Sequence, residues 1–241
     1  MAKMPAKTTR FWVDHRNWSG YLNAVDMDVT QELPNANTFQ DNGPRVVVGN
    51  YGHKHALRGF FDGSSSQIDA VSDTLLGTTS DHYLAELFGG TTEQNIVYES
   101  IVQMSGKPIK AAVGGAVMLD VPLEGAGGAS RSMILRNATL GASDTGISVD
   151  QGANTTVQTY QATFRFFAGT FTNAVLQVQD SSNGTTWGDS TGLTATSTGN
   201  LKAVRTTSAA ALRQYKRVIC TTLVGSADVE IAVTGGVVAG A

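Results

Sequence analysis

The chain has 241 residues, of which 41% are hydrophobic and 15% are charged, which is enough apolar material for a folded core and too little charge for a disordered chain. Its formal net charge of −3 excludes the bulk positive charge with which proteins attract nucleic acid. The single cysteine, Cys220, excludes an internal disulfide and cysteine-based metal clusters, and its place in an alternating run predicts a buried thiol.

Residues 1–9 are expected to form a flexible N-terminal arm. Lys3 and Lys7 are not followed by the apolar stretch of a secretion signal, so none is predicted. A bilayer span needs roughly 20 apolar residues, whereas the longest uncharged apolar run extends only from Ala111 to Leu119. We therefore expect no contact with a membrane.

The first strongly patterned segment is a strand. Val25, Met27 and Val29 alternate with polar residues, so that one face of the strand is apolar and the other carries Asp26 and Asp28. Two interpretations of the acidic face stay open. It is either an ordinary solvated face or an acidic stripe that lines a channel and repels DNA phosphates.

Three more strands and one helix are predicted in the first half of the chain. The strands cover residues 56–61, 97–104 and 113–123. Residues 105–108 (SGKP) have the composition of a turn between the last two. The helix, 66–76, is capped by Ser65 or Ser66 and ends at Gly77. Its apolar face, which predicts packing on a sheet, consists of Ile68, Val71, Leu75 and Leu76.

A glycine-rich stretch, residues 125–131 (GAGGASR), marks the predicted boundary between a domain over 10–128 and a domain over 129–241. Beyond it, strands are predicted at 158–167, 175–179, 215–222 and 229–234. Residues 180–187 (DSSNGTTW) predict a hairpin, because Asn-Gly readily adopts the positive φ angles of tight turns. The Thr/Ser-rich residues 190–200 are expected to be an exposed loop. Together these features predict an antiparallel β-sandwich.

No residue pattern predicts catalysis, a metal site or a cofactor. The sequence lacks a nucleophile elbow, phosphate-binding glycine loops and a plausible Cys/His pair. His53 and His55 could reach one metal from a strand, but no third ligand can be named, so solvated or rim histidines are favoured. Four carboxylates could pair as acid and base, although nothing in the sequence brings any two together: Glu93, Glu99, Asp120 and Glu124.

Two features of the second domain have competing interpretations. Asp180, Asn183 and Asp189 could suggest a calcium loop, but they lack the acidic ladder of such loops, so a turn held by local hydrogen bonds is favoured. Trp187 and other aromatic residues could form a sugar-stacking platform, although aromatic residues at alternating positions of a sandwich are more often core. Asn183 and Trp187 are the candidate surface residues of an outer module.

Three motifs in the first half carry a resemblance to a known family. In chain order they are residues 13–21 (VDHRNWSGY), 38–41 (TFQD) and 59–62 (GFFD), the last followed by the predicted helix. In this order they resemble the tail tube proteins of long-tailed bacteriophages of the siphophage type. The similarity covers roughly residues 9–128. An additional C-terminal module distinguishes this chain from the simplest members of that family.

The resemblance implies a mainly β fold, in which a tail-tube-like sandwich or barrel module with one short helix precedes an outer, antiparallel β-sandwich module. It implies a structural virion protein, not an enzyme, that assembles with itself into stacked rings and conducts DNA without binding it specifically. The rings would be hexamers, or trimers with pseudo-sixfold symmetry if the second module is also tube-like. Further implied partners are the tape measure, the tail terminator and the baseplate hub. The protein would be made in the host bacterial cytoplasm.

The loop from Leu33 to Val46 is the candidate for contacts between rings and subunits, with these residues: Pro34, Asn35, Thr38, Phe39, Asp41 and Asn42. The same resemblance would make Asp26 and Asp28 an acidic stripe facing the lumen. Two alternatives belong to other classes. One is a different virion part, such as a capsid decoration or baseplate protein, and the other is a carbohydrate-binding adhesin.

Overall fold

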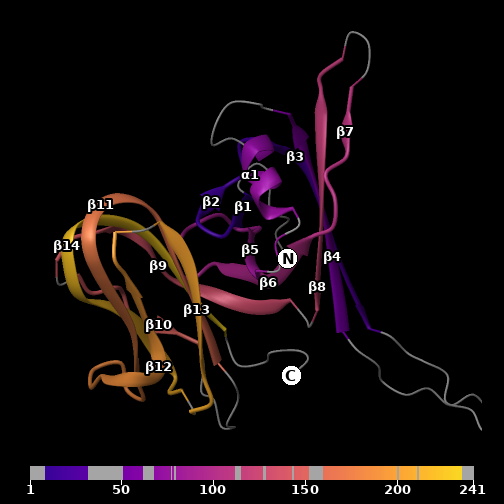
Figure 1. Ribbon diagram of the computed structural model, residues 1–241. Coiled ribbons are helices and arrows are strands. Elements are labelled where there is room, and N and C mark those ends of the chain that lie inside the picture. The colour runs from indigo at the N-terminus through magenta and orange to yellow at the C-terminus, as the bar shows by residue number, and fades with distance from the viewer. Residues whose placement is uncertain are drawn as a thin grey trace, which may run out of the picture. The chain divides into compact units, whose positions relative to one another are not determined.

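The computed structural model describes residues 9–31, 51–61, 68–76, 78, 80–111, 115–126, 129–142, 144–151, 160–199, 201–210 and 212–234. Within these residues the chain is mainly β with one short helix, which confirms the predicted fold class (Figure 1). The elements are β1 (Arg10–Val13), β2 (Arg16–Asn17), β3 (Leu22–Gln31), β4 (Tyr51–Phe60), α1 (Ile68–Leu75), β5 (His82–Leu87), β6 (Ile96–Met104), β7 (Ile109–Lys110), β8 (Met118–Ala126), β9 (Ser130–Leu140), β10 (Val149–Asp150), β11 (Tyr160–Ser181), β12 (Gly188–Ser197), β13 (Lys202–Ser208) and β14 (Tyr215–Thr234). No helix in these ranges is long and apolar enough to span a membrane.

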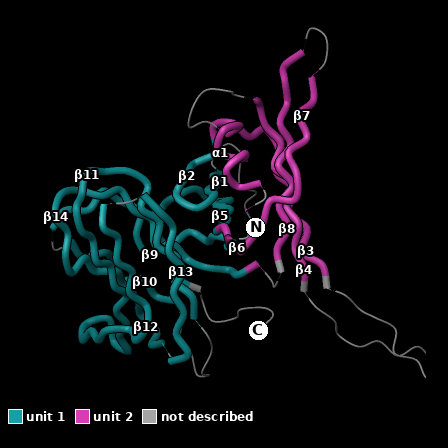
Figure 2. The backbone as a smooth tube through the Cα atoms, in the orientation of Figure 1, with its two compact units in different colours: residues 1–19, 83–99, 130–238 teal, residues 20–82, 100–129, 239–241 magenta. Residues whose placement is uncertain are grey.

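The chain groups into two compact units (Figure 2). Unit 1 comprises residues 1–19, 83–99 and 130–238, and unit 2 comprises residues 20–82, 100–129 and 239–241. This grouping differs from a single division near residue 128, because two early segments join the later half of the chain. The predicted modules 10–128 and 129–241 therefore stay a prediction, and the residues before Thr9 lie outside the described part.

Unit 1 is built around two long antiparallel strands, β11 and β14. Each was expected to be two shorter strands, and that expectation is wrong, because the chain bends without turning back. Gly169 and Gly225 lie at the bend with φ angles of 119° and 110°. A Cβ at Gly225 would collide with the carbonyl oxygen of Thr170, and one at Gly169 with that of Ser226. The glycines thus allow the two backbones to approach closely where the ribbon bends.

The bent ribbon takes part in two antiparallel layers. The first part of β11 pairs with β13 and the last part of β14 with β9, whereas their other ends pair with β12 and β10. Side chains from both layers form one core, which includes Phe164, Phe166, Phe171, Leu176, Val178, Leu193, Val218, Cys220, Ile231 and Val233. This arrangement is an antiparallel sandwich, and the buried Cys220 confirms its predicted environment.

Strand β12 corrects the prediction that residues 190–200 form an exposed loop. Ser190, Leu193, Ala195 and Ser197 are buried, and they alternate with exposed residues along most of the strand. Threonine favours strands through its branched Cβ, so a Thr/Ser-rich segment can complete a sheet when its inward positions are small or apolar.

A second apolar cluster of unit 1 lies where its sheet curls. In the strand order β12-β11-β14-β9-β6-β5-β1-β2, β11 and β1 are the second strands from the two opposite ends. Nevertheless the Trp12 ring of β1 stacks on the Phe167 ring of β11, with 3.8 Å between centroids. Arg205 of β13 lies 5.1 Å from the centre of the Tyr83 ring of β5. The sheet therefore curls so that β1 and β5 come into contact with β11 and β13.

Unit 2 contains a sheet in which β3, β4 and β8 are neighbours, and the other edge of β8 pairs with β7 and with the end of β6. Figure 2 shows α1 beside this sheet. The helix confirms the predicted one, with Ile68, Val71 and Leu75 buried, although Leu76 is 41% exposed instead of lying on the apolar face. Lys107, after β6, binds the carboxylates of Asp69 and Asp73 at 2.5 and 2.7 Å, which ties the helix to the end of β6. Residues 105–108, predicted as a turn, form the connection between β6 and β7 and contain no helix or strand.

Candidate assembly interface

Strand β3, which carries the predicted acidic face, is an edge strand. It pairs antiparallel with β4, so that Asp28 is opposite Lys54 and Asp26 is opposite Ala56. Among the described strands β3 has no other partner. Along residues 22–30 no side chain is fully buried, and Val29 is 44% exposed. One side of this strand therefore presents backbone donors and acceptors to whatever lies next to it.

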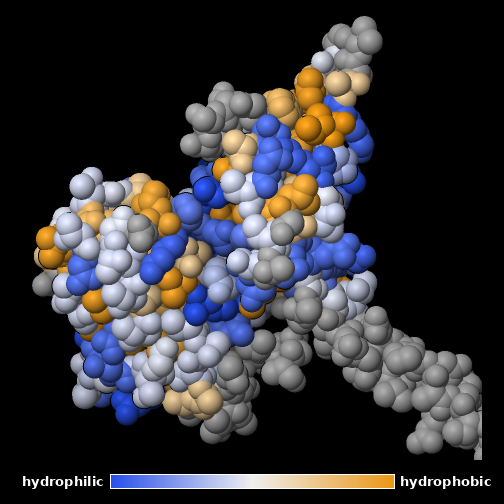
Figure 3. Space-filling model, in the orientation of Figure 1, coloured by the Kyte–Doolittle hydropathy of each residue, from blue (hydrophilic) through white to orange (hydrophobic). Residues whose placement is uncertain are grey.

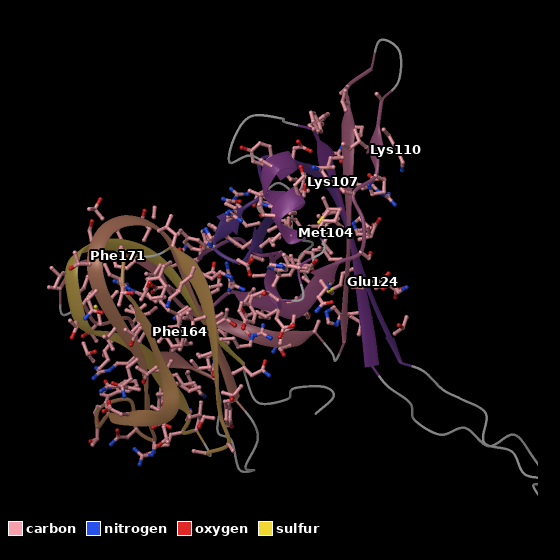
Figure 4. The ribbon with its side chains drawn as sticks, viewed as in Figure 1. Met104, Lys107, Lys110, Glu124, Phe164 and Phe171 are labelled. Atoms are coloured by element: carbon pink, nitrogen blue, oxygen red, sulfur yellow. The ribbon has the colours of Figure 1, made fainter. Side chains whose placement is uncertain are left out.

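The exposed face of the sheet carries charges whose sign changes from strand to strand. After the carboxylates of β3 come Lys54 and Arg58 on β4, then Asp120 and Glu124 on β8, and finally Lys110 on β7. Figure 4 shows Lys110 and Glu124 on the side of the sheet away from α1, and Lys107 on the helix side.

Ion pairs join each strand to the next across this face. Arg58 lies 3.5 Å from Asp26 and Lys54 lies 3.5 Å from Glu124, while Lys110 lies 2.5 Å from Asp120. Asp26 and Asp28 thus share an exposed face, but cations are interleaved between them and the next carboxylates. The exposed face of the sheet therefore carries a network of ion pairs of mixed charge. That this face lines a lumen stays a prediction.

The opposite face of the sheet is packed. Leu57, Leu119 and Val121 are fully buried there. His53 and His55 also lie on this face, 1% and 2% exposed with 5.1 Å between ring centroids, so their prediction as solvated or rim residues is wrong. Their alternation in the sequence with the charged residues Lys54 and Arg58 could have placed them inward. Within the described residues no group of three His, Cys, Asp or Glu side chains could hold a metal.

Large apolar side chains are exposed at one end of unit 2. Phe60 is 49% exposed, Ile109 51% and Val117 38%. Phe60 stands opposite the partly buried Met118 on the charged face. In Figure 3 strongly hydrophobic residues gather at the end of the unit next to β7. These side chains make this end of the unit the apolar part of its described surface.

The remaining predicted site residues fall into two groups. All of the loop candidates (Pro34, Asn35, Thr38, Phe39, Asp41 and Asn42) lie outside the described residues. Asn183 lies in the loop of the β11–β12 hairpin, which confirms that hairpin. Its side-chain oxygen accepts hydrogen bonds from the backbone N–H groups of Thr185 and Thr186 at 3.0 and 2.8 Å. Asn183 therefore shapes the turn, as the favoured interpretation of this segment expects.

Trp187 belongs to a surface network. The guanidinium of Arg217 lies over its ring, 4.3 Å from the centroid. Arg217 also donates two hydrogen bonds to the Gln179 side-chain oxygen, at 2.9 and 2.7 Å, and Gln179 donates to Asp189 at 2.8 Å. One face of the indole is therefore already occupied, and Asp189 is engaged by an amide.

Sequence reasoning missed a buried charged cluster in unit 1. Arg165 on β11 donates to Glu99 on β6 at 2.9 Å and to Glu230 on β14 at 3.3 Å. Ser132 donates to the second oxygen of Glu99 at 3.0 Å. Burial raises the pKa of Glu230 to about 7, against the attraction of the Arg165 guanidinium. Arg165 stands between two phenylalanines in the sequence, a signal that could have marked it as buried.

The cluster has no access to substrate, since Arg165 and Glu230 are fully buried. The cluster places Glu99 near Glu230. It does not contain Glu93, Asp120 or Glu124, the carboxylates that the sequence analysis considered together with Glu99. One cation between two carboxylates thus joins residues of β6, β11 and β14 inside the core. We assign it a structural role.

Comparisons with known proteins find similarity at the level of structure. No family model and no curated protein sequence matches the chain. Among solved structures, a chain of the virion of a native gene transfer agent particle is 10% identical, with 54% of this chain and 98% of that chain covered at a TM-score of 0.43. The SPP1 Dit protein is 11% identical, with 94% and 98% covered at a TM-score of 0.38. The SPP1 tail tube is 8% identical, with 52% and 80% covered at a TM-score of 0.39.

Proposed function

We propose that this chain is a structural tail protein of a virion that assembles with itself into stacked rings, forming a tail tube for the passage of DNA. The observation that carries the proposal is the sheet of unit 2. One face is packed and the other is solvated and charged, yet its β3 edge has no partner strand within the described residues. An open edge of this length is a template for another chain. The resemblance of residues 9–128 to tail tube proteins supports the same function.

In such a ring each copy contributes its sheet to a continuous barrel, which removes the open edges. The solvated face would line the lumen. With carboxylates and cations interleaved on that face, DNA phosphates would meet no continuous positive surface, so the duplex would slide without adhering. The tube would then act without turnover and without a cofactor.

Stacking and external contacts complete the proposal. The loop that contains Pro34, Asn35, Thr38, Phe39, Asp41 and Asn42 would join successive rings. The C-terminal module would lie on the outside of the tube. The tape measure, tail terminator and baseplate hub would be the other partners. A head-to-tail contact that does not close on itself builds a filament, as a tube requires.

Negative-stain electron microscopy of the concentrated protein tests the proposal, with two matched valine variants. Val29→Lys places a charge on the open edge, whereas Val224→Lys changes a valine of unit 1 that is 57% exposed. We expect hollow tubes from the wild type and from Val224→Lys, and folded monomers from Val29→Lys. Closed small oligomers from the wild type would favour a decoration or baseplate protein, and monomers at every concentration would contradict self-assembly.

A further inference from the structure

The alternating charges of the unit 2 sheet specify which edges meet between copies. Across the exposed face the strands are acidic (β3), basic (β4), acidic (β8) and basic (β7). The outer strand β3 is therefore acidic, whereas β7, which covers β8 at Leu119 and Met118, is basic. The end of β6 covers β8 only at Leu123 and Glu124. Within one copy Asp26 and Lys110 each have an ion-pair partner on the neighbouring strand. Asp28, on the open edge, is exposed and has no salt bridge to another described residue.

We propose that β3 of each copy pairs with β7 of the next copy in the ring, so that Asp26 and Asp28 lie beside Lys110 of that neighbour. The inference rests on the proposed ring assembly and names its contact. The alternation of charge then continues across the subunit boundary, as it does between strands inside one copy. Opposite charges on neighbouring strands stabilise the pairing, and like charges destabilise it.

The same pattern disfavours the competing contacts. A two-fold contact between two β3 edges would bring Asp26 and Asp28 against the same carboxylates of the other copy. A two-fold contact between two β7 edges would bring Lys110 against Lys110. Both self-complementary dimers therefore meet charge repulsion, and only the head-to-tail contact that generates a ring or filament is favoured.

The contact requires an axial offset between copies. In the register of the sheet Lys110 is level with Met118 and Phe60, whereas Asp26 is level with Ala56. Phe60 and Ala56 are four residues apart on β4, so neighbouring copies would be offset by about 13 Å at roughly 3.3 Å per residue. A closed barrel needs an offset of this kind, because its strands tilt against the axis.

Charge reversal tests the contact through the critical concentration for assembly. Asp28→Lys and Lys110→Glu should each raise it about tenfold, because an attraction between exposed charges becomes a repulsion. The double variant should assemble clearly better than the two single losses combined would give, although Lys110→Glu also removes the ion pair with Asp120 inside each copy. Arg131→Glu, at an exposed position of β9 in unit 1, is the control and should change nothing. Thermal unfolding establishes that each variant is folded.

The outcomes separate this contact from the proposed function. If the wild type assembles and the double variant is as poor as the two single losses combined, the β3–β7 contact is wrong while the tube stands. If the wild type stays monomeric, the proposed function fails, and this contact with it. Mixing the two single variants adds a check on symmetry, because strict alternation of the two chains closes a hexamer but not a trimer.

Discussion

Replacing Glu230 by glutamine tests the electrostatics of the buried cluster in unit 1. Folding moves the pKa of this carboxyl from 4.5 to about 7, chiefly through burial. The folded protein therefore holds a proton that the unfolded chain releases. The stability that this proton confers is fully present below pH 4.5 and is lost as the pH rises to about 7.

The size of the effect follows from the shift. One pKa unit corresponds to about 1.4 kcal/mol, so the wild type should lose about 3 kcal/mol of unfolding free energy between pH 4.5 and pH 8. Glutamine has the shape of the protonated acid and cannot ionise. Glu230→Gln should match the wild type at pH 4.5 and exceed it by about 3 kcal/mol at pH 8.

Urea unfolding of both proteins at closely spaced pH values measures this difference. Subtracting the two curves removes the groups that they share, among them His15, whose pKa is lowered by burial and whose slope is opposite. Lys216, whose pKa burial lowers to about 8, is also shared. A difference that stays constant with pH, or a variant that is less stable at pH 8, would refute the reasoning.

Three further changes test individual contacts. Arg165→Met should lower the free energy of unfolding at pH 8 by about 3–5 kcal/mol in urea unfolding, because two buried carboxylates lose their cation. Lowering the pH should restore part of this stability. Gly225→Ala should cost at least about 2 kcal/mol, because a Cβ there meets the Thr170 carbonyl, while Gly141→Ala, which meets open space, should stay within about 0.5 kcal/mol. Trp187→Ala should leave tube assembly unchanged in electron microscopy; loss of glycan binding in this variant would favour the adhesin alternative.

Local patterns in the sequence predicted the elements whose formation depends on residues close together in the chain. The alternation around Val25 identifies β3, the apolar spacing after Ile68 identifies α1, and the Asn183–Gly184 pair identifies the β11–β12 hairpin. The predicted ends of other strands were less accurate. Strand β4 begins at Tyr51 and not at residue 56, and β8 begins at Met118 and not at residue 113. Strand ends depend on partners elsewhere in the chain, which one sequence does not show.

The failures share a physical cause. Gly169 looks the same in a sequence whether it ends a strand or bends one, and only the approach of Ser226 decides between the two. The buried cluster depends on register, because Arg165 meets Glu230 through the pairing of β11 with β14. Glu99 joins them from β6, another strand of the same sheet. Such long-range pairing could not be predicted from local spacing.

The ion pairs on the unit 2 sheet are exposed, whereas the charged cluster of unit 1 is buried. Salt and pH should therefore act on different properties of the protein: salt on assembly, and pH on the stability of unit 1. The ion pairs around Lys54 and Arg58 are exposed, so added salt screens their charges. Added salt should therefore weaken the contact between copies. The cluster at Arg165 is fully buried, so salt should leave it nearly unchanged while pH alters its stability. Assembly that responded to pH between 4.5 and 7 in proportion to unit 1 stability would contradict this separation.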